Sequence, residues 1–227
     1  MRSIEGERNE HSDYYLQQCQ ISYRSGAGER TYIVSGNRTG QQASCRAEGL
    51  RAKLFETMGT LPESVDLVLL SMGICGGSAA KEPFPVKTVM PKVDDCITLL
   101  LHTDDRWFPN LKKGGHLYLT DKIQGDLSVR NIRENLIEQY GEKKGLRIFD
   151  IWFDSYKSVD VIDTGVYDSY DREYLRIAEE EAAMINCPVC HVPGSNHLLE
   201  KLVGGRWDHQ FLVVEKGRVL YDEDFLI

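Results

Sequence analysis

The chain has 227 residues, of which 41% are hydrophobic and 27% are charged, the balance of an ordinary soluble globular protein. Its formal charge of -8 argues against a broad phosphate-binding surface, so we do not expect nucleic acid as a partner. Apolar runs are shorter than the roughly 18 residues of a membrane span, and the N-terminal stretch lacks the apolar core of a secretory signal, so we expect a cytoplasmic protein with no membrane partner.

Strand-like and helix-like segments alternate along the chain. In chain order they are a strand at 31–36, a helix at 45–58, strands at 65–73 and 86–93, a helix at 95–108, a strand at 116–123, a helix at 131–145, a strand at 158–165, a helix at 171–186, a strand at 190–193, a helix at 195–205 and a strand at 210–217. This alternation predicts an α/β fold of the Rossmann-like type, a mainly parallel sheet with helices on both faces. An arrangement of two similar halves is the alternative.

The same reading predicts the domain organisation. Residues 1–30 are expected to form a polar N-terminal extension, and residues 31–227 a single α/β domain. The chain carries neither a G-x-G-x-x-G nor a Walker sequence, so no nucleotide cofactor is expected. The sequence leaves a homo-oligomer open.

Three cysteines stand at junctions between a strand and a helix. Cys75 and Cys96 each follow a strand-like run, and Cys45 begins a helix-like segment. Ligands of parallel sheets gather at the carboxyl ends of strands, and a helix N-terminus favours the thiolate form of cysteine. Nearby glycines would let the backbone approach a bulky inorganic ligand; they are Gly73, Gly76 and Gly77. We therefore predict one shared metal or cofactor site, although a single buried cysteine is commonly an apolar filler.

These cysteines lie in short motifs. They are C-x-x-E from Cys45, G-x-C-G from Gly73 and P-x-x-D-D-C-I-x-L-L-L from Pro91, followed by Y-L-T at 118–120, I-D-T-G at 162–165 and G-x-W-D at 205–208. Over roughly residues 40–220, the sequence resembles the prokaryotic family known as domain of unknown function 1638, found largely in anaerobic bacteria and methanogenic archaea. The resemblance implies that Cys45, Cys75 and Cys96 are the characteristic thiols. It also implies a link to corrinoid-dependent methyltransferases.

Three cysteine thiolates would leave one metal coordination position without a protein ligand. Two kinds of metal centre, a cluster or a single ion, can be bound in this way. A [4Fe-4S] cluster would keep one iron free, and a zinc ion would keep one coordination position free. The anaerobic setting implied by the resemblance favours iron and sulfur. We expect a redox enzyme or accessory factor of corrinoid-linked one-carbon metabolism that meets a small-molecule substrate or a corrinoid protein. The alternative is a zinc-thiolate enzyme or a metal carrier without turnover.

Further candidates surround this site in the sequence. Asp95 and Asp163 are candidate catalytic residues that could handle a proton or contact substrate, with a helix cap and a strand-ending turn as the respective structural alternatives. Cys187 and Cys190 have C-x-x-C spacing, but they run into a strand rather than opening a helix as a thioredoxin-like site does. Either cysteine, or His191, could supply a fourth metal ligand.

Overall fold

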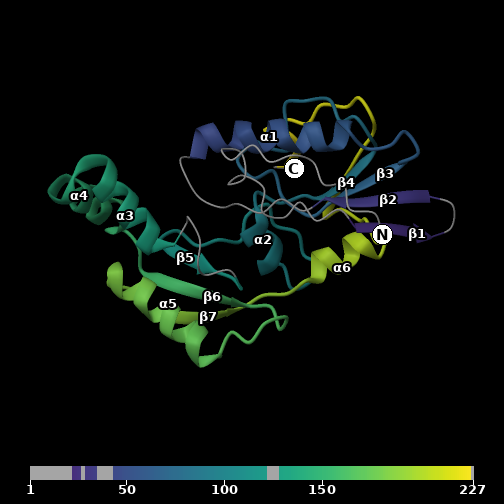
Figure 1. Ribbon diagram of the computed structural model, residues 1–227. Coiled ribbons are helices and arrows are strands. Elements are labelled where there is room, and N and C mark those ends of the chain that lie inside the picture. The colour runs from purple at the N-terminus through teal and green to yellow at the C-terminus, as the bar shows by residue number, and fades with distance from the viewer. Residues whose placement is uncertain (1–21, 27–28, 35–42, 122–127, 226–227) are drawn as a thin grey trace.

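The computed structural model of the protein describes residues 22–26, 29–34, 43–121 and 128–225 (Figure 1). The helices are α1 (Ala43–Gly59), α2 (Cys96–Leu101), α3 (Val129–Tyr140), α4 (Glu142–Phe153), α5 (Arg172–Met184) and α6 (His197–Val203), and a 3-10 helix, η1 (Asp222–Phe225), follows them. The strands are β1 (Ser22–Gly26), β2 (Glu29–Val34), β3 (Leu67–Leu70), β4 (Thr88–Pro91), β5 (His116–Leu119), β6 (Ser158–Asp163), β7 (Val189–Pro193) and β8 (Phe211–Val214). Most of the predicted N-terminal extension lies outside the described residues.

The strands form two sheets. In the first, the order is β1-β2-β3-β4-β8, with β2, β3 and β4 parallel to one another and the two outer strands antiparallel to their neighbours. In the second, β5, β6 and β7 are all parallel. The predicted Rossmann-like α/β fold is confirmed, with the strands divided between two sheets.

Both faces of the five-stranded sheet are covered. Val68 and Leu70 of β3 pack in one apolar cluster with residues of α1, whereas Leu67 and Leu69 pack in another with residues of α2 and α6. A parallel strand that is buried on both faces needs apolar residues at successive positions. This explains why β3 reads as an unbroken apolar run.

The three-stranded sheet has its own core. Val159 and Val161 of β6 pack in an apolar cluster with residues of α3, α4 and α5. Helices α3 and α4 form a hairpin at the left of Figure 1. Their close approach depends on Gly145, where an added Cβ would lie 2.5 Å from the Leu136 carbonyl oxygen.

The short helix α2 joins the two sheets (Figure 1). Its N-terminus follows β4 of the first sheet, and its C-terminal end contacts the segment that leaves β7 of the second. There the Ser195 amide donates to the Leu100 carbonyl (2.8 Å), and the Ser195 hydroxyl donates to the His102 carbonyl (2.6 Å). The carboxyl ends of both sheets therefore meet at α2. No helix among the described residues is long and apolar enough to cross a membrane.

Candidate functional site

Cys75 and Cys96 follow neighbouring parallel strands, and backbone hydrogen bonds join the two loops that carry them. The Ile74 amide donates to the Val93 carbonyl (3.0 Å), and the Cys75 amide donates to the Asp94 carbonyl (2.8 Å). These bonds extend the pairing of β3 and β4 beyond the ends of the strands. The structure thus places Cys75 and the first residue of α2, Cys96, at one edge of the sheet.

Gly73 permits this contact between the loops. A Cβ at this position would lie 2.5 Å from the Val93 oxygen and 2.8 Å from the Asp95 nitrogen. Both are backbone atoms, so they cannot turn aside as a flexible side chain can. Any larger residue would force the two loops apart.

Cys75 begins a left-handed turn. The φ angles are 49° at Cys75, 70° at Gly76 and 86° at Gly77. This region is unfavourable for a residue with a Cβ, so the surrounding contacts must hold Cys75 there. Its side chain is only 2% exposed within the α1 cluster, and Arg51 of α1 donates to the Gly77 carbonyl from Nε (3.1 Å) and Nη2 (2.9 Å). The turn is therefore fixed against α1.

Cys45 lies in the first turn of α1, the helix that follows β2. Because β2, β3 and β4 are adjacent and parallel, one candidate cysteine follows each of three neighbouring strands. Arg51, which binds the Cys75 turn, lies six residues along α1 from Cys45, or about 9 Å along the helix axis. Among the side chains that the structure describes, which do not include that of Cys45, no group of three or more His, Cys, Asp or Glu residues could hold a metal ion.

Two carboxylates and one ammonium group lie beside Cys96. Asp95 is the N-cap of α2, where its Oδ1 accepts from the amides of Ile97 (3.0 Å) and Thr98 (3.1 Å). Lys112 Nζ contacts Oδ2 of Asp94 (2.5 Å) and Oδ2 of Asp95 (2.6 Å). Partial burial alone would lower the pKa of Lys112, but the hydrogen bonds to both carboxylates outweigh it and raise that pKa. The cap alternative that we gave for Asp95 is therefore seen in the structure.

Asp94 differs from Asp95 in one respect. Its second oxygen, Oδ1, is buried and has no hydrogen-bond partner among the described residues. A buried acceptor without a donor is unfavourable, because it has lost water and gained nothing. This oxygen is closed off from solvent, so the Asp94 side chain would have to turn before the atom could meet a bound molecule.

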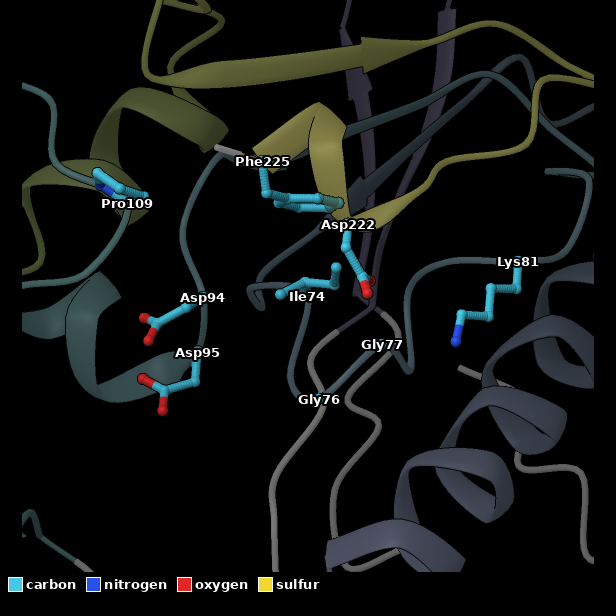
Figure 2. A pocket seen from close by; sticks show the side chains of 9 residues that line it. All are labelled: Ile74, Gly76, Gly77, Lys81, Asp94, Asp95, Pro109, Asp222 and Phe225. Carbon is cyan, nitrogen blue, oxygen red and sulfur yellow. The ribbon is translucent and has the colours of Figure 1, made fainter. Parts of the chain in front are cut away.

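A cavity of about 510 Å³ lies at this edge of the sheet (Figure 2). Its lining residues are Ile74, Gly76, Gly77, Lys81, Asp94, Asp95, Pro109, Asp222 and Phe225. The neighbours of Cys75 and the two residues before Cys96 thus belong to its wall. In Figure 2, Asp94 and Asp95 lie on one side of Ile74, and Lys81 and Asp222 lie on the other. The volume is within the range of small-molecule sites.

Asp163 lies on the other sheet. We expected it at the same sheet edge as the cysteines, but β6, which it ends, belongs to the three-stranded sheet. Its Oδ1 accepts from the Gly165 amide (3.1 Å), so it forms the strand-ending turn that was the structural alternative. A sequence pattern of alternating elements does not say which strands share a sheet, so the expected shared edge was wrong, while a catalytic role for Asp163 stays a prediction.

The C-x-x-C pair also lies on the three-stranded sheet. Cys187 precedes β7 and Cys190 lies within it, so the pair opens a strand, not a helix. Burial raises the pKa of the Cys187 thiol, which disfavours the reactive thiolate. His191 Nε2 lies 3.0 Å from the Ser169 carbonyl oxygen, and its ring stacks on Tyr170 at 4.1 Å. Cys187 and His191 thus have local partners, since the Cys187 thiol also lies 3.5 Å from the Ile185 carbonyl oxygen.

Sequence reasoning missed a second polar cluster. His116 of β5 lies with Nδ1 2.7 Å from Oδ2 of Asp160 in β6, and the Ser158 hydroxyl donates to the other oxygen of Asp160. Asp160 is buried in the middle of a parallel strand. A charged residue inside an otherwise apolar strand was the available signal.

Comparison with known proteins gave one match. A family model with the description "Protein of unknown function (DUF1638)" matches residues 45–203. The matched range begins at Cys45 and includes Cys75, Cys96 and the residues between them. No curated protein and no solved structure matches the chain.

Proposed function

This chain belongs to the DUF1638 family, and from that premise we propose that Cys45, Cys75 and Cys96 together bind a [4Fe-4S] cluster. The observation that carries the proposal is the topology: β2, β3 and β4 are adjacent and parallel, and each leads to one of these cysteines. The carboxyl ends of such strands are where α/β proteins bind their ligands.

The chemistry of the donor set fits such a group. Thiolates are soft ligands, which iron–sulfur clusters and zinc both take. Three of them leave one metal position without a protein ligand, and a bound cluster would supply one-electron chemistry and an open iron there. Around the thiols, Gly73 allows close approach of the two loops, and Gly76 and Gly77 carry no side chain that would fill the adjoining space.

The charged residues nearby have supporting roles in this proposal. Lys112 offsets the charges of Asp94 and Asp95, which would otherwise repel thiolates placed beside them. Both oxygens of Asp95 are engaged, so we assign it to positioning α2 and Cys96. Asp94 lines the same cavity, and its Oδ2 is bound to Lys112.

The proposal includes a class of activity and of partner. The cavity beside the thiols favours a small-molecule substrate, and a redox enzyme or accessory factor is the function that combines a cluster with such a cavity. The family resemblance adds corrinoid-linked one-carbon metabolism and a corrinoid protein as the context. A cytoplasmic location is part of the proposal, since cysteines in a chain of this length suit thiols or metal ligands of a reducing compartment better than a disulfide framework.

Anaerobic purification tests the proposal. A brown protein with bound iron and sulfide, whose visible absorption bleaches with dithionite, is the expected result. Replacing Cys45, Cys75 or Cys96 by Ser should each remove most of the iron. Cys187→Ser is the matched control, since that thiol belongs to the other sheet, and it should keep the full iron content. Full iron in Cys75→Ser would overturn the proposal, and a colourless protein with stoichiometric zinc would support the zinc alternative.

A further inference from the structure

We infer that Arg51 of α1 stabilises the reduced form of a cluster bound at the three-cysteine site. The inference rests on the proposed function and deepens it, by naming a residue that sets the reduction potential of the cluster. Two observations carry it: the attachment of Arg51 to the turn that begins at Cys75, and a positive charge that has no acidic partner among the described residues.

Two hydrogen bonds attach the Arg51 side chain to the Cys75 turn. Its Nε and Nη2 both donate to the Gly77 carbonyl oxygen, at 3.1 and 2.9 Å. A Cβ added at Gly77 would lie 3.6 Å from Arg51 Nη2, so the guanidinium group lies directly against the turn. Because this group is a rigid plane, the two bonds fix its charge relative to the backbone that carries Cys75.

The positive charge of Arg51 is not offset by a carboxylate. No described carboxylate lies within ion-pair distance of the guanidinium group, whereas Lys112, the cation beside Cys96, contacts two of them. The Arg51 side chain is half-buried, and a charge in that position is screened less than one in open solvent. Arg51 can therefore act on an anion bound at the same turn.

Arg51 also keeps free hydrogen-bond donors. Its Nη1 has no partner among the described residues, and it does not belong to their buried unpartnered atoms, so this nitrogen is accessible. The N–H groups of a guanidinium donate well to charged acceptors. The thiolate and sulfide sulfurs of a cluster are acceptors of this kind, and hydrogen bonds to them tune its potential.

The charge of the bound cluster decides the direction of the effect. A cluster held by three thiolates is an anion, and the uptake of one electron from an external donor makes it more negative, with no bond formed or broken at Arg51. A fixed positive charge nearby favours the more negative state. Arg51 should therefore raise the reduction potential, as a positioning residue that is not itself a ligand.

An anaerobic redox titration of the iron-loaded, full-length protein tests the inference, with dithionite as the electron donor. Arg51→Gln keeps an N–H donor but loses the charge, and it should lower the potential by about 59 mV, a tenfold fall in the equilibrium constant for one-electron reduction. Arg51→Lys keeps the charge, so its equilibrium constant should stay within about threefold of the wild-type value. A residue that only supported the fold would not make the potential follow the charge.

Arg147→Gln is the matched control. It removes the same charge from an exposed position on α4, a helix that packs on the other sheet, and it should leave the potential unchanged. Loss of iron from Arg51→Gln but not from Arg51→Lys would support the inference, because only the lysine variant keeps the charge.

Iron content separates this inference from the proposed function. Iron-loaded Arg51→Gln with the wild-type potential would overturn the inference alone, and so would equal shifts in the two Arg51 variants. Wild-type protein that contains no iron would overturn both the inference and the proposed function.

Discussion

Replacing Gly73 by Ala should separate the two loops that carry Cys75 and Cys96. The new Cβ would stand 2.5 Å from the Val93 oxygen and 2.8 Å from the Asp95 nitrogen, and neither backbone atom can yield without moving its loop. Relief of the clash would stretch the Ile74 to Val93 and Cys75 to Asp94 hydrogen bonds, now 3.0 and 2.8 Å. Overpacking of about 1–3 kcal/mol, together with two weakened hydrogen bonds at about 0.5–1.5 kcal/mol each, predicts a loss of about 2–6 kcal/mol in the free energy of unfolding.

Urea unfolding followed by tryptophan fluorescence measures this loss, with Gly49→Ala as the control. Gly49 lies inside α1 with nothing within 4 Å of its would-be Cβ, so alanine there should stabilise the protein by about 0.5–1 kcal/mol. Under the proposed function, Gly73→Ala should also lower the iron content, because Cys75 and Cys96 would no longer keep their spacing. An unfolding curve for Gly73→Ala that overlays the wild-type curve would refute the reasoning about the loops.

Two other perturbations follow from buried polar groups. Burial, only partly offset by the hydrogen bond to the Thr98 carbonyl (2.8 Å), lowers the pKa of His102 below its ordinary 6.5, so the unfolded chain binds the proton more readily. The contribution of neutral His102 to the free energy of unfolding should be complete above pH 6.5 and fall as the pH drops below that value. Urea unfolding should therefore show a smaller loss of stability between about pH 7.5 and pH 5.5 in His102→Gln than in the wild-type protein. Equal losses in the two proteins would contradict this reasoning. Asp160→Ala should cost about 1–3 kcal/mol in the same assay, because the buried Ser158 hydroxyl loses its acceptor, whereas exposed Asp150→Ala should stay within about 0.5 kcal/mol. Similar values for these two variants would argue against a structural role for Asp160.

The strands near the site were predictable, because a strand that is buried on both faces appears in the sequence as a short run of consecutive apolar residues. The run that becomes β3 is apolar at every position, since α1 covers one face and α2 and α6 cover the other. The cap at Asp95 was predictable for the same reason, as a short polar side chain before an apolar helix satisfies amides two and three residues away. Such features depend on neighbours in sequence.

Features that depend on distant residues were not predictable. A run of charged residues on a helix is usually a solvated face, yet Glu181, the last of three consecutive glutamates, is 3% exposed and accepts a hydrogen bond from the Arg130 amide (3.2 Å). Helix α4 was missed because it starts directly after Gly141, which ends α3, and no side chain caps its N-terminus. The sequence around Lys112 gave no sign of its contacts with Asp94 and Asp95, which lie 18 and 17 residues away, respectively.

The order of strands has a consequence for how the chain assembles during synthesis. The three-stranded sheet comes from one continuous stretch, residues 116–193, which is inserted between β4 and β8 of the other sheet. That stretch can leave the ribosome and pair its strands while β4 still has a bare edge. An unpaired edge strand is prone to join other chains until its own partner arrives. The sheet that bears the cysteines is thus begun first and completed last, when residues 211–214 emerge and pair with β4.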